Sequence, residues 1–376
     1  MHVAIDAHLL SGRPGYRSAG VHRYIDCLLR HVRQADARVR YTVLVGREGV
    51  CPDPLLPVRQ ARWPTERAAV RAVWEQTAQP WLLRRIGADL VHAPVFVAPI
   101  AAPCPSVVTI HDLSFLRFPQ LFRPANRLYL RIMTRLSTQR ARRIIAVSRH
   151  AAEETTRLLG IGPERINVVY HGVDPAFRPI SRADVEAFRQ RAGLPARYAL
   201  FVGTLEPRKN LARLVEAFAR VRDDTLHLVL AGGKGWFYDE LYARVETLGL
   251  QHAVTFAGYV PQEDLPLWYN AATAFVYPSL YEGFGLPVVE AQACGVPVLT
   301  SDVSSLPEAA GGASVLVDPY DVEALAAGLQ RLLQDQPLRE GLREAGLTHA
   351  QRFTWPKAAW ETTRVYWQAI ASGGAT

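Results

Sequence analysis

The stretch YPSLYEGFGLPVVEAQACGVPVL, residues 277–299, contains the pattern from which the fold can be inferred. A strand-like apolar run ends at Tyr277, a Gly-Phe-Gly turn follows, and Pro287 stands where a helix would begin, a position that favours proline. Two carboxylates, Glu282 and Glu290, bracket the turn. A strand, a glycine turn and a helix in this order are typical of one unit of a parallel α/β sheet.

The same alternation of strand-like and helix-like runs extends along the whole chain. In the first half the predicted strands are His2–Ala7, Tyr41–Val45, Leu90–His92, Ser106–Ile110, Arg143–Val147 and Ile166–Tyr170. In the second half they are Tyr198–Val202, Leu226–Leu230, Val254–Ala257, Ala274–Tyr277 and Val296–Thr300. The predicted helices lie near Val21–Val32, Glu66–Arg85, Pro124–Arg142, His150–Leu159, Tyr238–Leu248, Gln262–Ala271 and from Pro287 onward. We therefore predict an α/β protein with two facing Rossmann-like domains.

The chain of 376 residues is longer than a single hydrophobic core usually supports. The segment HGVDPAFRPISR, residues 171–182, contains Gly, two Pro and Asp after a complete strand and is the expected break between domains. We assign 1–177 to an N-terminal domain on the acceptor side and 178–353 to a C-terminal domain on the donor side. Residues 354–376 form an aromatic-rich C-terminal helix that is expected to cross back to the N-terminal domain and pack across the domain junction. Ligands bind at the carboxyl ends of the strands in such sheets, so facing domains would form a cleft.

The net charge of +8 is unevenly distributed. Residues 1–177 contain 25 Arg and no Lys against 13 acidic residues, which gives +12, whereas residues 178–376 carry −4. A basic half indicates contact with an anionic surface or ligand, although an arginine-rich genome would produce the same bias. Basic and aromatic residues do not interleave as in nucleic-acid-binding modules, so we expect no nucleic-acid partner.

The four cysteines are scattered and form no CxxC pair, so neither a zinc site nor a disulfide framework is indicated. No uncharged apolar run is long enough to span a bilayer, and the N-terminus lacks the pattern of a signal peptide. We expect a cytoplasmic protein, with a peripheral position at the inner face of the membrane left open.

The loop from Glu282 to Leu286 joins a strand to a helix and is a candidate phosphate site. Glycines let backbone N–H groups approach an anion closely, and the N-terminus of a helix adds partial positive charge. Glu282 and Glu290 could accept hydrogen bonds from sugar hydroxyls on either side. The alternatives are a solvated loop acid for Glu282 and a carboxylate stabilised by the helix dipole for Glu290.

A second motif, FVGTLEPRKNL, spans residues 201–211. Arg208 and Lys209 follow the predicted strand that ends at Val202 and precede a helix that we expect Asn210 to cap. An Arg fork and a Lys point charge at the end of a strand are positioned to hold a diphosphate. A solvated pair of loop cations is the alternative.

Weaker signals come from the first half of the chain. The loop SGRPGYRSAGVHRY, residues 11–24, has glycines before a helix but not the dinucleotide spacing, and could wrap a second phosphate. His111 and Asp112 directly follow a strand, where His111 could bind a sugar or serve as a packed structural histidine. There is no Walker A motif and no Asp-x-Asp pair at a strand end, so we expect no divalent metal.

In combination, these motifs resemble those of family 4 of the retaining glycosyltransferases, enzymes of GT-B architecture. The similar segments are EGFGLPVVE (282–290), GTLEPRKNL (203–211), AGYVPQEDLPLWYNAA (257–272), HGVD (171–174) and His111-Asp112. The resemblance covers essentially the whole chain, and the combination is far more specific than any one motif.

The resemblance implies roles for individual residues. The catalytic residues it implies are His111, Arg208, Lys209 and Glu282. The two cations would bind the donor diphosphate, and the histidine and the glutamate would contact the donor sugar. The donor-binding residues it implies are Gly20, Gly203, Tyr259, Val260, Phe284, Gly285, Leu286 and Glu290. Gly20 would approach the β-phosphate, Glu290 the ribose and the backbone at 259–260 the base. Many relatives carry Arg where this chain has Thr204, which leaves two cations in this loop.

The reaction implied by the resemblance is transfer with retention, in which the acceptor hydroxyl attacks the face from which the diphosphate leaves. No nucleophilic side chain is then required, and no cofactor is expected. The segment 281–308 is most similar to mannosyltransferases that use GDP-mannose, so GDP is favoured over UDP. The acceptor would be a glycan, with a lipid linkage left open; its binding residues are unknown. A basic face formed by Arg123, Arg127, Arg131, Arg135, Arg142 and Arg143 would suit an anionic membrane, although a solvated helix face explains it equally well.

Two other functions fit the same fold. A nucleotide-sugar 2-epimerase would bind the same donor but needs acid–base carboxylates placed for elimination. A catalytically silent glycan-binding protein would not need the charged residues of the two motifs. Incubation with a nucleotide sugar and no acceptor separates the first alternative from a transferase, because only an epimerase converts the sugar.

Overall fold

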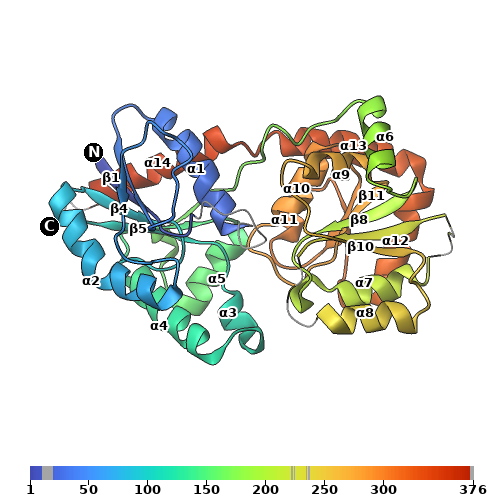
Figure 1. Cartoon of the computed structure of the whole chain (residues 1–376), viewed down its shortest axis with the longest axis horizontal. Helices are drawn as coiled ribbons and strands as arrows, with labels where there is room; N and C mark the ends of the chain where they lie inside the picture. The colour runs from blue at the N-terminus through green and yellow to red at the C-terminus, as the bar shows by residue number, and fades with distance from the viewer. Residues whose placement is uncertain (11–19, 222, 224, 234, 236–237, 373–376) are drawn as a thin grey trace. The chain divides into compact units, whose positions relative to one another are not determined.

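The computed structural model describes residues 1–10, 20–221, 223, 225–233, 235 and 238–372 (Figure 1). Contacts between residues divide the chain into two compact units. Unit 1 consists of Met1–Gly172 and Thr354–Thr376, and unit 2 of Val173–Phe353. The domain limits given above, with their acceptor and donor roles, stay a prediction.

Within the described part of unit 1, seven parallel strands form one sheet in the order β3-β2-β1-β4-β5-β6-β7. They are β1 His2–Ala7, β2 Arg40–Val45, β3 Val58–Gln60, β4 Leu90–Ala93, β5 Ser106–Ile110, β6 Arg143–Ala146 and β7 Ile166–Val168. Val3, Ile5 and Leu90 are fully buried, as expected where helices cover both faces of a parallel sheet. The strand order reverses between β1 and β4, which is the position where such sheets bind ligands.

The connections in unit 1 are mainly helical. They are α1 Val21–Ala35, α2 Ala68–Ile86, α3 Ser114–Arg117, α4 Pro124–Arg140 and α5 Arg149–Leu159, with short 3-10 turns at Pro119–Leu121 and Pro163–Arg165. Helix α1 is amphipathic and buries Ile25, Leu28 and Val32. Helix α5 begins after Ser148, whose hydroxyl accepts a hydrogen bond from the backbone N–H of Ala151 at 3.0 Å.

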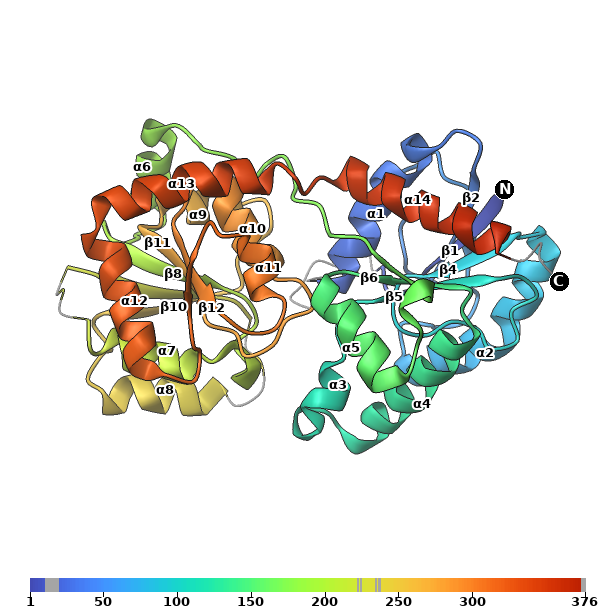
Figure 2. The same ribbon diagram turned by 180° about the vertical axis from the view of Figure 1, so that it is seen from behind.

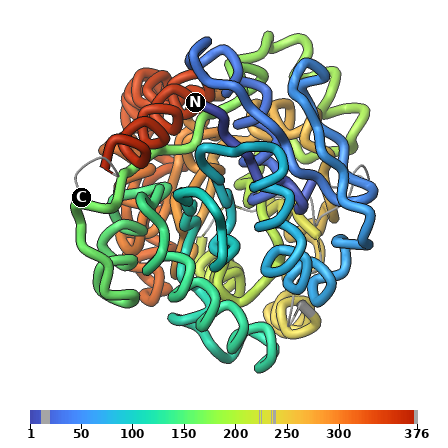
Figure 3. Tube along the Cα trace, turned by 90° about the vertical axis from the view of Figure 1, so that its left-hand side faces the viewer, coloured from blue at the N-terminus to red at the C-terminus, as the bar shows by residue number. Residues whose placement is uncertain are grey.

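The C-terminal helix α14, Trp355–Ala371, belongs to unit 1 and packs beside α1 (Figures 2 and 3). Tyr366 is fully buried, and its hydroxyl hydrogen-bonds Nδ1 of His92 in β4 at 2.7 Å. The indole of Trp355 stacks on the ring of His171, with 6.0 Å between ring centres. The predicted return of the C-terminal helix to the N-terminal domain is confirmed.

Unit 2 repeats the architecture. Across its described residues, six parallel strands lie in the order β10-β9-β8-β11-β12-β13. They are β8 Tyr198–Val202, β9 His227–Ala231, β10 Val254–Gly258, β11 Ala274–Tyr277, β12 Val298–Ser301 and β13 Val315–Val317. The helices are α6 Arg182–Arg191, α7 Leu211–Phe218, α8 Tyr238–Thr247, α9 Leu265–Ala271, α10 Leu286–Ala293, α11 Leu306–Ala310, α12 Val322–Gln334 and α13 Gln336–Ala350. Helix α7 packs with α8 and α12, whereas α10 packs with α11 and α13.

The predicted α/β class and the two parallel sheets are confirmed, and most element bounds agree within two or three residues. Two edge strands, β3 and β13, were not predicted. All three residues of β3 are exposed, and Leu316 in β13 is 40% exposed. Neither strand therefore carries the fully apolar run by which the central strands are recognised. No helix in the described ranges is long and apolar enough to cross a membrane.

Candidate active site

The two motifs singled out in the sequence lie at neighbouring strand ends in unit 2. Strand β8 leads into a 3-10 turn, Pro207–Lys209, and β11 leads into the loop that contains Glu282. Strands β8 and β11 are hydrogen-bonded neighbours, and the strand order of this sheet reverses between them. The motifs therefore meet at the position where open α/β sheets bind ligands.

Lys209, Tyr277 and Glu282 form a buried polar cluster at this position. Lys209 Nζ donates to Glu282 Oε1 at 2.5 Å and to the hydroxyl of Tyr277 at 2.7 Å. The Tyr277 hydroxyl in turn donates to Glu282 Oε1 at 3.0 Å. An ammonium group has three N–H donors, so one donor of Lys209 is left after the two acceptors that the described residues supply.

Arg208 lies at the edge of this cluster, with 17% of its side chain exposed. Its guanidinium donates to Glu206 Oε1 at 2.9 Å, to the carbonyl oxygen of Tyr281 at 2.8 Å and to Glu282 Oε2 at 3.5 Å. The backbone carbonyl of Arg208 also accepts from the N–H of Leu280 at 2.9 Å. These bonds hold the guanidinium beside the loop that follows β11.

The charges in this cluster shift one another's pKa values. Burial alone would raise the pKa of Glu282, but Lys209 and Arg208 lower it to about 2. Burial lowers the pKa of Lys209 despite the opposing effect of Glu282. Burial and the charge of Glu282 raise the pKa of Tyr277 well above its ordinary value. At neutral pH the Glu282 carboxylate is therefore ionised and the Tyr277 phenol is neutral.

The loop between Glu282 and helix α10 is fixed from its backbone. The hydroxyls of Ser304 and Ser305 each donate to the carbonyl oxygen of Glu282 at 2.9 Å. Gly285 has a φ of 100°, and a Cβ there would lie 2.9 Å from Leu306 Cδ2. Glycine is therefore required at this position both by conformation and by space. Pro287 lies in the first turn of α10, as the sequence predicts.

Of the other predicted donor-binding residues in unit 2, Phe284 and Glu290 are buried. Phe284 packs against Phe353, with 5.4 Å between ring centres. Glu290 is 2% exposed and accepts a hydrogen bond from the hydroxyl of Tyr269 at 3.3 Å. Leu286 is the first residue of α10. Their contacts with a donor stay predictions.

Gly203 follows one strand of this sheet, and Tyr259 and Val260 both follow another. Gly203 comes directly after β8, and a Cβ on the neighbouring Gly232 would collide with its carbonyl. Tyr259 is 48% exposed and follows β10, two strands from β8. Val260 is nearly buried. The structure thus places these residues along one edge of the sheet, without testing their roles.

The predicted residues of the N-terminal half lie in unit 1. His111 is buried, and its Nε2 donates to the carbonyl oxygen of Pro94 at 2.8 Å. Burial lowers its pKa, so the ring is neutral at pH 7. Gly20 directly precedes α1 with a φ of 66°. The predicted loop at 11–19 lies outside the described residues, and the roles of His111 and Gly20 stay predictions.

The sequence does not predict several groups of the site, and one predicted hydrogen bond is absent. The hydroxyl of Tyr277 and the serines at 304 and 305 are part of the site, but Tyr277 reads only as the end of a buried strand. Asn210 stands before α7 with a φ of 61°, yet its amide donates to the carbonyl oxygen of Pro319 at 2.6 Å. The predicted capping bond is therefore wrong.

No group of three or more His, Cys, Asp or Glu that could hold a metal ion occurs among the described residues.

Comparison with known proteins agrees with this geometry. Residues 18–177 match the model of "Glycosyltransferase Family 4", and residues 184–349 match that of "Glycosyl transferases group 1". The O-antigen chain mannosyltransferase B of Escherichia coli is 38% identical over 293 residues, which are 77% of this chain and 76% of that protein. The chain belongs to glycosyltransferase family 4. Its membership favours a transferase over the epimerase alternative.

Other relatives of this glycosyltransferase carry different names. A D-inositol 3-phosphate glycosyltransferase of Streptomyces bingchenggensis is 37% identical over 61% of this chain and 53% of its own length. Among solved structures, sucrose-phosphate synthase of Thermosynechococcus elongatus has a TM-score of 0.75 at 23% identity, over 99% of this chain and 100% of its own. Anabaena HepE in complex with UDP and glucose has a TM-score of 0.76 at 22% identity, over 98% and 100%. These structures establish the GT-B fold.

Proposed function

We propose that this glycosyltransferase moves a mannosyl group from GDP-mannose to a hydroxyl of a glycan, with retention and without a metal ion or cofactor. The observation that carries the proposal is the cluster of Arg208, Lys209 and Glu282 beside the glycine turn of unit 2. Mannose is favoured because the E. coli relative, at 38% identity, is named a mannosyltransferase. Its name also suggests a polysaccharide acceptor of the O-antigen type.

In the proposed reaction the bond between the anomeric carbon and the diphosphate oxygen breaks, and a bond to the acceptor oxygen forms on the same face. Negative charge then develops on the departing phosphate, where fixed cations and dipoles stabilise it most effectively. Arg208, the remaining donor of Lys209 and the N-terminus of α10 would supply this stabilisation. The leaving phosphate would accept the proton of the acceptor hydroxyl, so no side-chain base is assigned.

In this mechanism Glu282 would do more than contact the donor sugar. Both of its oxygens already accept hydrogen bonds from Lys209, Tyr277 or Arg208. Its carboxylate would therefore orient the two cations toward the diphosphate, with any contact to the donor sugar in addition.

The test is transfer from GDP-mannose to methyl α-D-mannopyranoside in the presence of EDTA, with the anomeric configuration of the product read by NMR. We expect an α-linked product and about a 10²–10³-fold loss of kcat in Arg208→Ala. The exposed Arg182→Gln serves as a matched control and should be unaffected. Conversion of GDP-mannose to another nucleotide sugar without acceptor, an inverted product or loss of activity with EDTA would contradict the proposal.

We also propose that helix α4 contacts an anionic membrane from the cytoplasmic side. Arg127, Arg131 and Arg135 are exposed along one side of the helix, and α4 contains no acidic residue. Three apolar side chains, Leu128, Ile132 and Leu136, lie next to them and are 58%, 47% and 39% exposed. Arginines alternating with exposed apolar residues are typical of helices that lie in a membrane interface.

Two arginines of the predicted basic face form hydrogen bonds to another part of the chain. Arg142 donates to the backbone carbonyl of Ser372 at 2.9 Å, and Arg143 donates to the hydroxyl of the same serine at 2.9 Å. The proposed face therefore consists of the α4 arginines and the exposed Arg123 that precedes the helix.

Sedimentation with phosphatidylglycerol vesicles tests this contact. Each Arg near an anionic surface contributes about 1 kcal/mol, so R127Q/R131Q/R135Q should weaken binding by about two orders of magnitude. R59Q/R62Q/R67Q removes the same charge from other exposed positions of unit 1 and should bind almost as the parent does. Equal losses in both variants, or binding to phosphatidylcholine alone, would overturn the contact.

A further inference from the structure

The phenol of Tyr277 contacts both members of the buried Lys209–Glu282 pair in unit 2. Its oxygen accepts from Lys209 Nζ at 2.7 Å and donates to Glu282 Oε1 at 3.0 Å. Lys209 Nζ and Glu282 Oε1 are themselves 2.5 Å apart. Each of the three groups therefore bonds the other two, and the phenol acts as acceptor and donor at once.

The ring of Tyr277 is held in place by its neighbours in the sheet. It is 1% exposed and stacks on Phe201 of β8, with 5.6 Å between ring centres, and on Phe275 of β11, with 5.7 Å. The hydroxyl of Thr300 in β12 donates to the backbone carbonyl oxygen of Tyr277 at 2.8 Å. Side chains of three neighbouring strands thus hold this residue, so the sheet sets the position of the phenol oxygen.

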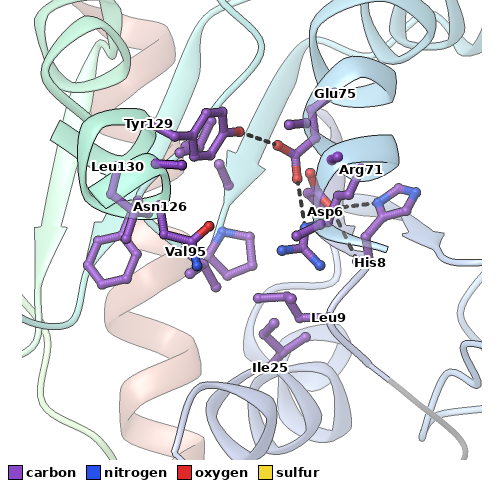
Figure 4. A pocket seen from close by; sticks show the side chains of 18 residues that line it. Asp6, His8, Leu9, Ile25, Arg71, Glu75, Val95, Asn126, Tyr129 and Leu130 are labelled. Carbon is purple, nitrogen blue, oxygen red and sulfur yellow. Dashed lines mark hydrogen bonds and ion pairs between the residues drawn. The ribbon is translucent and has the colours of Figure 1, made fainter. Parts of the chain in front are cut away.

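Unit 1 has a polar cluster at the matching position of its own sheet, around a cavity of about 400 Å³ at the ends of β1 and β4 (Figure 4). Asp6 there accepts from His8 Nδ1 at 2.7 Å, and Glu75 lies 3.5 Å from Arg71 Nε. Tyr129 of α4 donates to Glu75 at 3.4 Å from the other side of the cavity. Among the described residues this phenol bonds the acid and not the cation, so of the two clusters only that of unit 2 has a phenol shared by both.

The shared phenol limits how far Lys209 can pair with Glu282. An ammonium group has three N–H donors, and a carboxylate can accept at both of its oxygens. Without the phenol oxygen, the donor that Lys209 now gives to Tyr277 could turn toward the same carboxylate. With it, two donors point to two separate acceptors, and the tetrahedral geometry of the ammonium then fixes the direction of the third.

We propose that Tyr277 is a positioning residue of the donor site, which holds Lys209 so that its third N–H is available to the leaving diphosphate. This inference rests on the proposed transferase function and adds a residue to its mechanism. Tyr277 is buried and acts through Lys209 and Glu282. Donors stabilise developing charge best when they are already in place, because no reorganisation is then needed during the reaction. A phenol fixed in the sheet supplies this order to a lysine side chain that has four rotatable bonds.

The variant Tyr277→Phe removes the hydroxyl and keeps the aromatic stack. We expect its kcat with GDP-mannose to fall about tenfold or more, the effect of one hydrogen bond to a charged group. The affinity for GDP should fall less, because contacts with the diphosphate strengthen as charge develops on it.

The matched control is Tyr198→Phe, the same chemical change at the other end of the same sheet. Tyr198 is fully buried at the start of β8, and its hydroxyl donates to the backbone carbonyl oxygen of Trp268 at 2.9 Å. This variant also loses a buried hydrogen bond, but it should keep the kcat of the parent. Thermal unfolding of both variants separates a loss of stability from a loss of positioning.

A second measurement needs no catalysis and follows the ionisation of Lys209. The charged and titratable groups that face its ammonium are Glu282 and Tyr277 across the cluster and Arg208 and Glu206 in its own loop. Burial lowers the pKa of Lys209, and Glu282 opposes this effect. Loss of the phenol removes an acceptor from the charged form and should lower this pKa further.

GDP is therefore titrated calorimetrically into the three chains, with EDTA present, from about pH 7 to about pH 10. The affinity of Tyr277→Phe for GDP should decline at a lower pH than that of the parent or of Tyr198→Phe. Ionisation of the ligand itself is common to the three chains and cancels in the comparison.

Two results would overturn the inference while leaving the transferase function intact. These are equal kcat values for Tyr277→Phe and Tyr198→Phe, and the same pH dependence of GDP affinity in all three chains. If the parent does not bind GDP, the proposed donor is contradicted, and the pH comparison is made with inorganic pyrophosphate instead. A parent chain that binds neither would contradict the diphosphate site and this inference together.

Discussion

At the scale of single residues, the most informative feature is the buried pair of Lys209 and Glu282. Both side chains are about nine-tenths buried, and their nitrogen and oxygen atoms lie 2.5 Å apart. Removing charges from water is costly, and replacing a buried ion pair by apolar residues often stabilises a protein. A pair kept at a sheet edge where ligands bind is therefore better explained by function than by stability.

Replacing Lys209 alone should be costly, because it leaves a buried carboxylate without its main partner. We expect Lys209→Met to lower the free energy of unfolding by about 3–5 kcal/mol, as measured by urea denaturation. The double variant with Glu282→Gln removes both charges and should recover most of this loss while remaining inactive. A single variant as stable as the parent would contradict the geometry of the cluster.

Glu75 should make the stability of unit 1 depend on pH. Its folded pKa is about 8 against an ordinary 4.5, so its contribution is fully present below pH 4.5 and is lost as the pH rises through 8. Relative to the parent, Glu75→Gln should therefore gain stability between these two pH values, on the order of a few kcal/mol. Urea denaturation of both chains across this range measures the difference, and parallel pH profiles would refute it.

Arg208, Lys209 and Glu282 could be predicted from the sequence as neighbours, because the ends of adjacent parallel strands meet at one edge. Tyr277 could not, since a tyrosine at the end of an apolar strand usually serves as core. Asp6 and Glu75 are separated by sixty-nine positions and lie on a strand end and a helix. Only the folded sheet brings them to one pocket, so no spacing in the sequence indicates them.

At the scale of elements, the turn that leads into α10 depends on one glycine. Gly285 has a φ of 100°, and a Cβ added there would lie 2.9 Å from Leu306 and 3.2 Å from Ala309 in α11. The same turn orients the first N–H groups of α10 and carries Glu282 at its other end. Its conformation thus links the position of the carboxylate to that of the helix N-terminus.

Gly285→Ala should destabilise the protein by about 1–3 kcal/mol and weaken GDP binding, because the added methyl group meets both a strained conformation and a filled space. Gly341→Ala is the matched control. Gly341 lies within α13 with open space around it and should gain about 0.5–1 kcal/mol on the same change. Thermal unfolding with and without GDP measures both effects, and equal behaviour of the two variants would count against the role of the turn.

The central elements of both sheets could be predicted because their strands are buried on both faces. Strands β8 and β11 match their predicted bounds, since YALFV and AFVY are unbroken apolar runs. The edge strands β3 and β13 have one side open to solvent and lose this signal. The predicted helix ends differ from the observed ends by a few residues where no capping side chain marks them, as at α9.

At the scale of the whole molecule, the last helix of the chain completes the first unit. Helix α14 contributes Trp355, Ala359, Val365 and Tyr366 to the same core as β1 and α1. The hydroxyl of Tyr366 bonds His92, whose pKa burial lowers to about 3, so that the ring is neutral. Unit 1 therefore consists of two stretches of chain that are distant in sequence.

Tyr366→Ala should open a cavity in unit 1 and cost about 3–5 kcal/mol. Hydrogen exchange should lose protection in peptides of unit 1, including β1 and α1, before those of unit 2. Tyr366→Phe, which removes only the hydroxyl, should cost about 1–3 kcal/mol by leaving a buried nitrogen of His92 without its partner. Loss of protection confined to unit 2 would contradict the conclusion that α14 stabilises unit 1.

The proposed donor site in unit 2 can be tested by calorimetric titration of GDP in the presence of EDTA. The parent chain should bind GDP with EDTA present, and Arg208→Ala should bind it about tenfold or more weakly, whereas Arg182→Gln should be unchanged. Binding that disappears with EDTA, or equal affinity in the parent and Arg208→Ala, would contradict a diphosphate held by Arg208, Lys209 and the turn before α10.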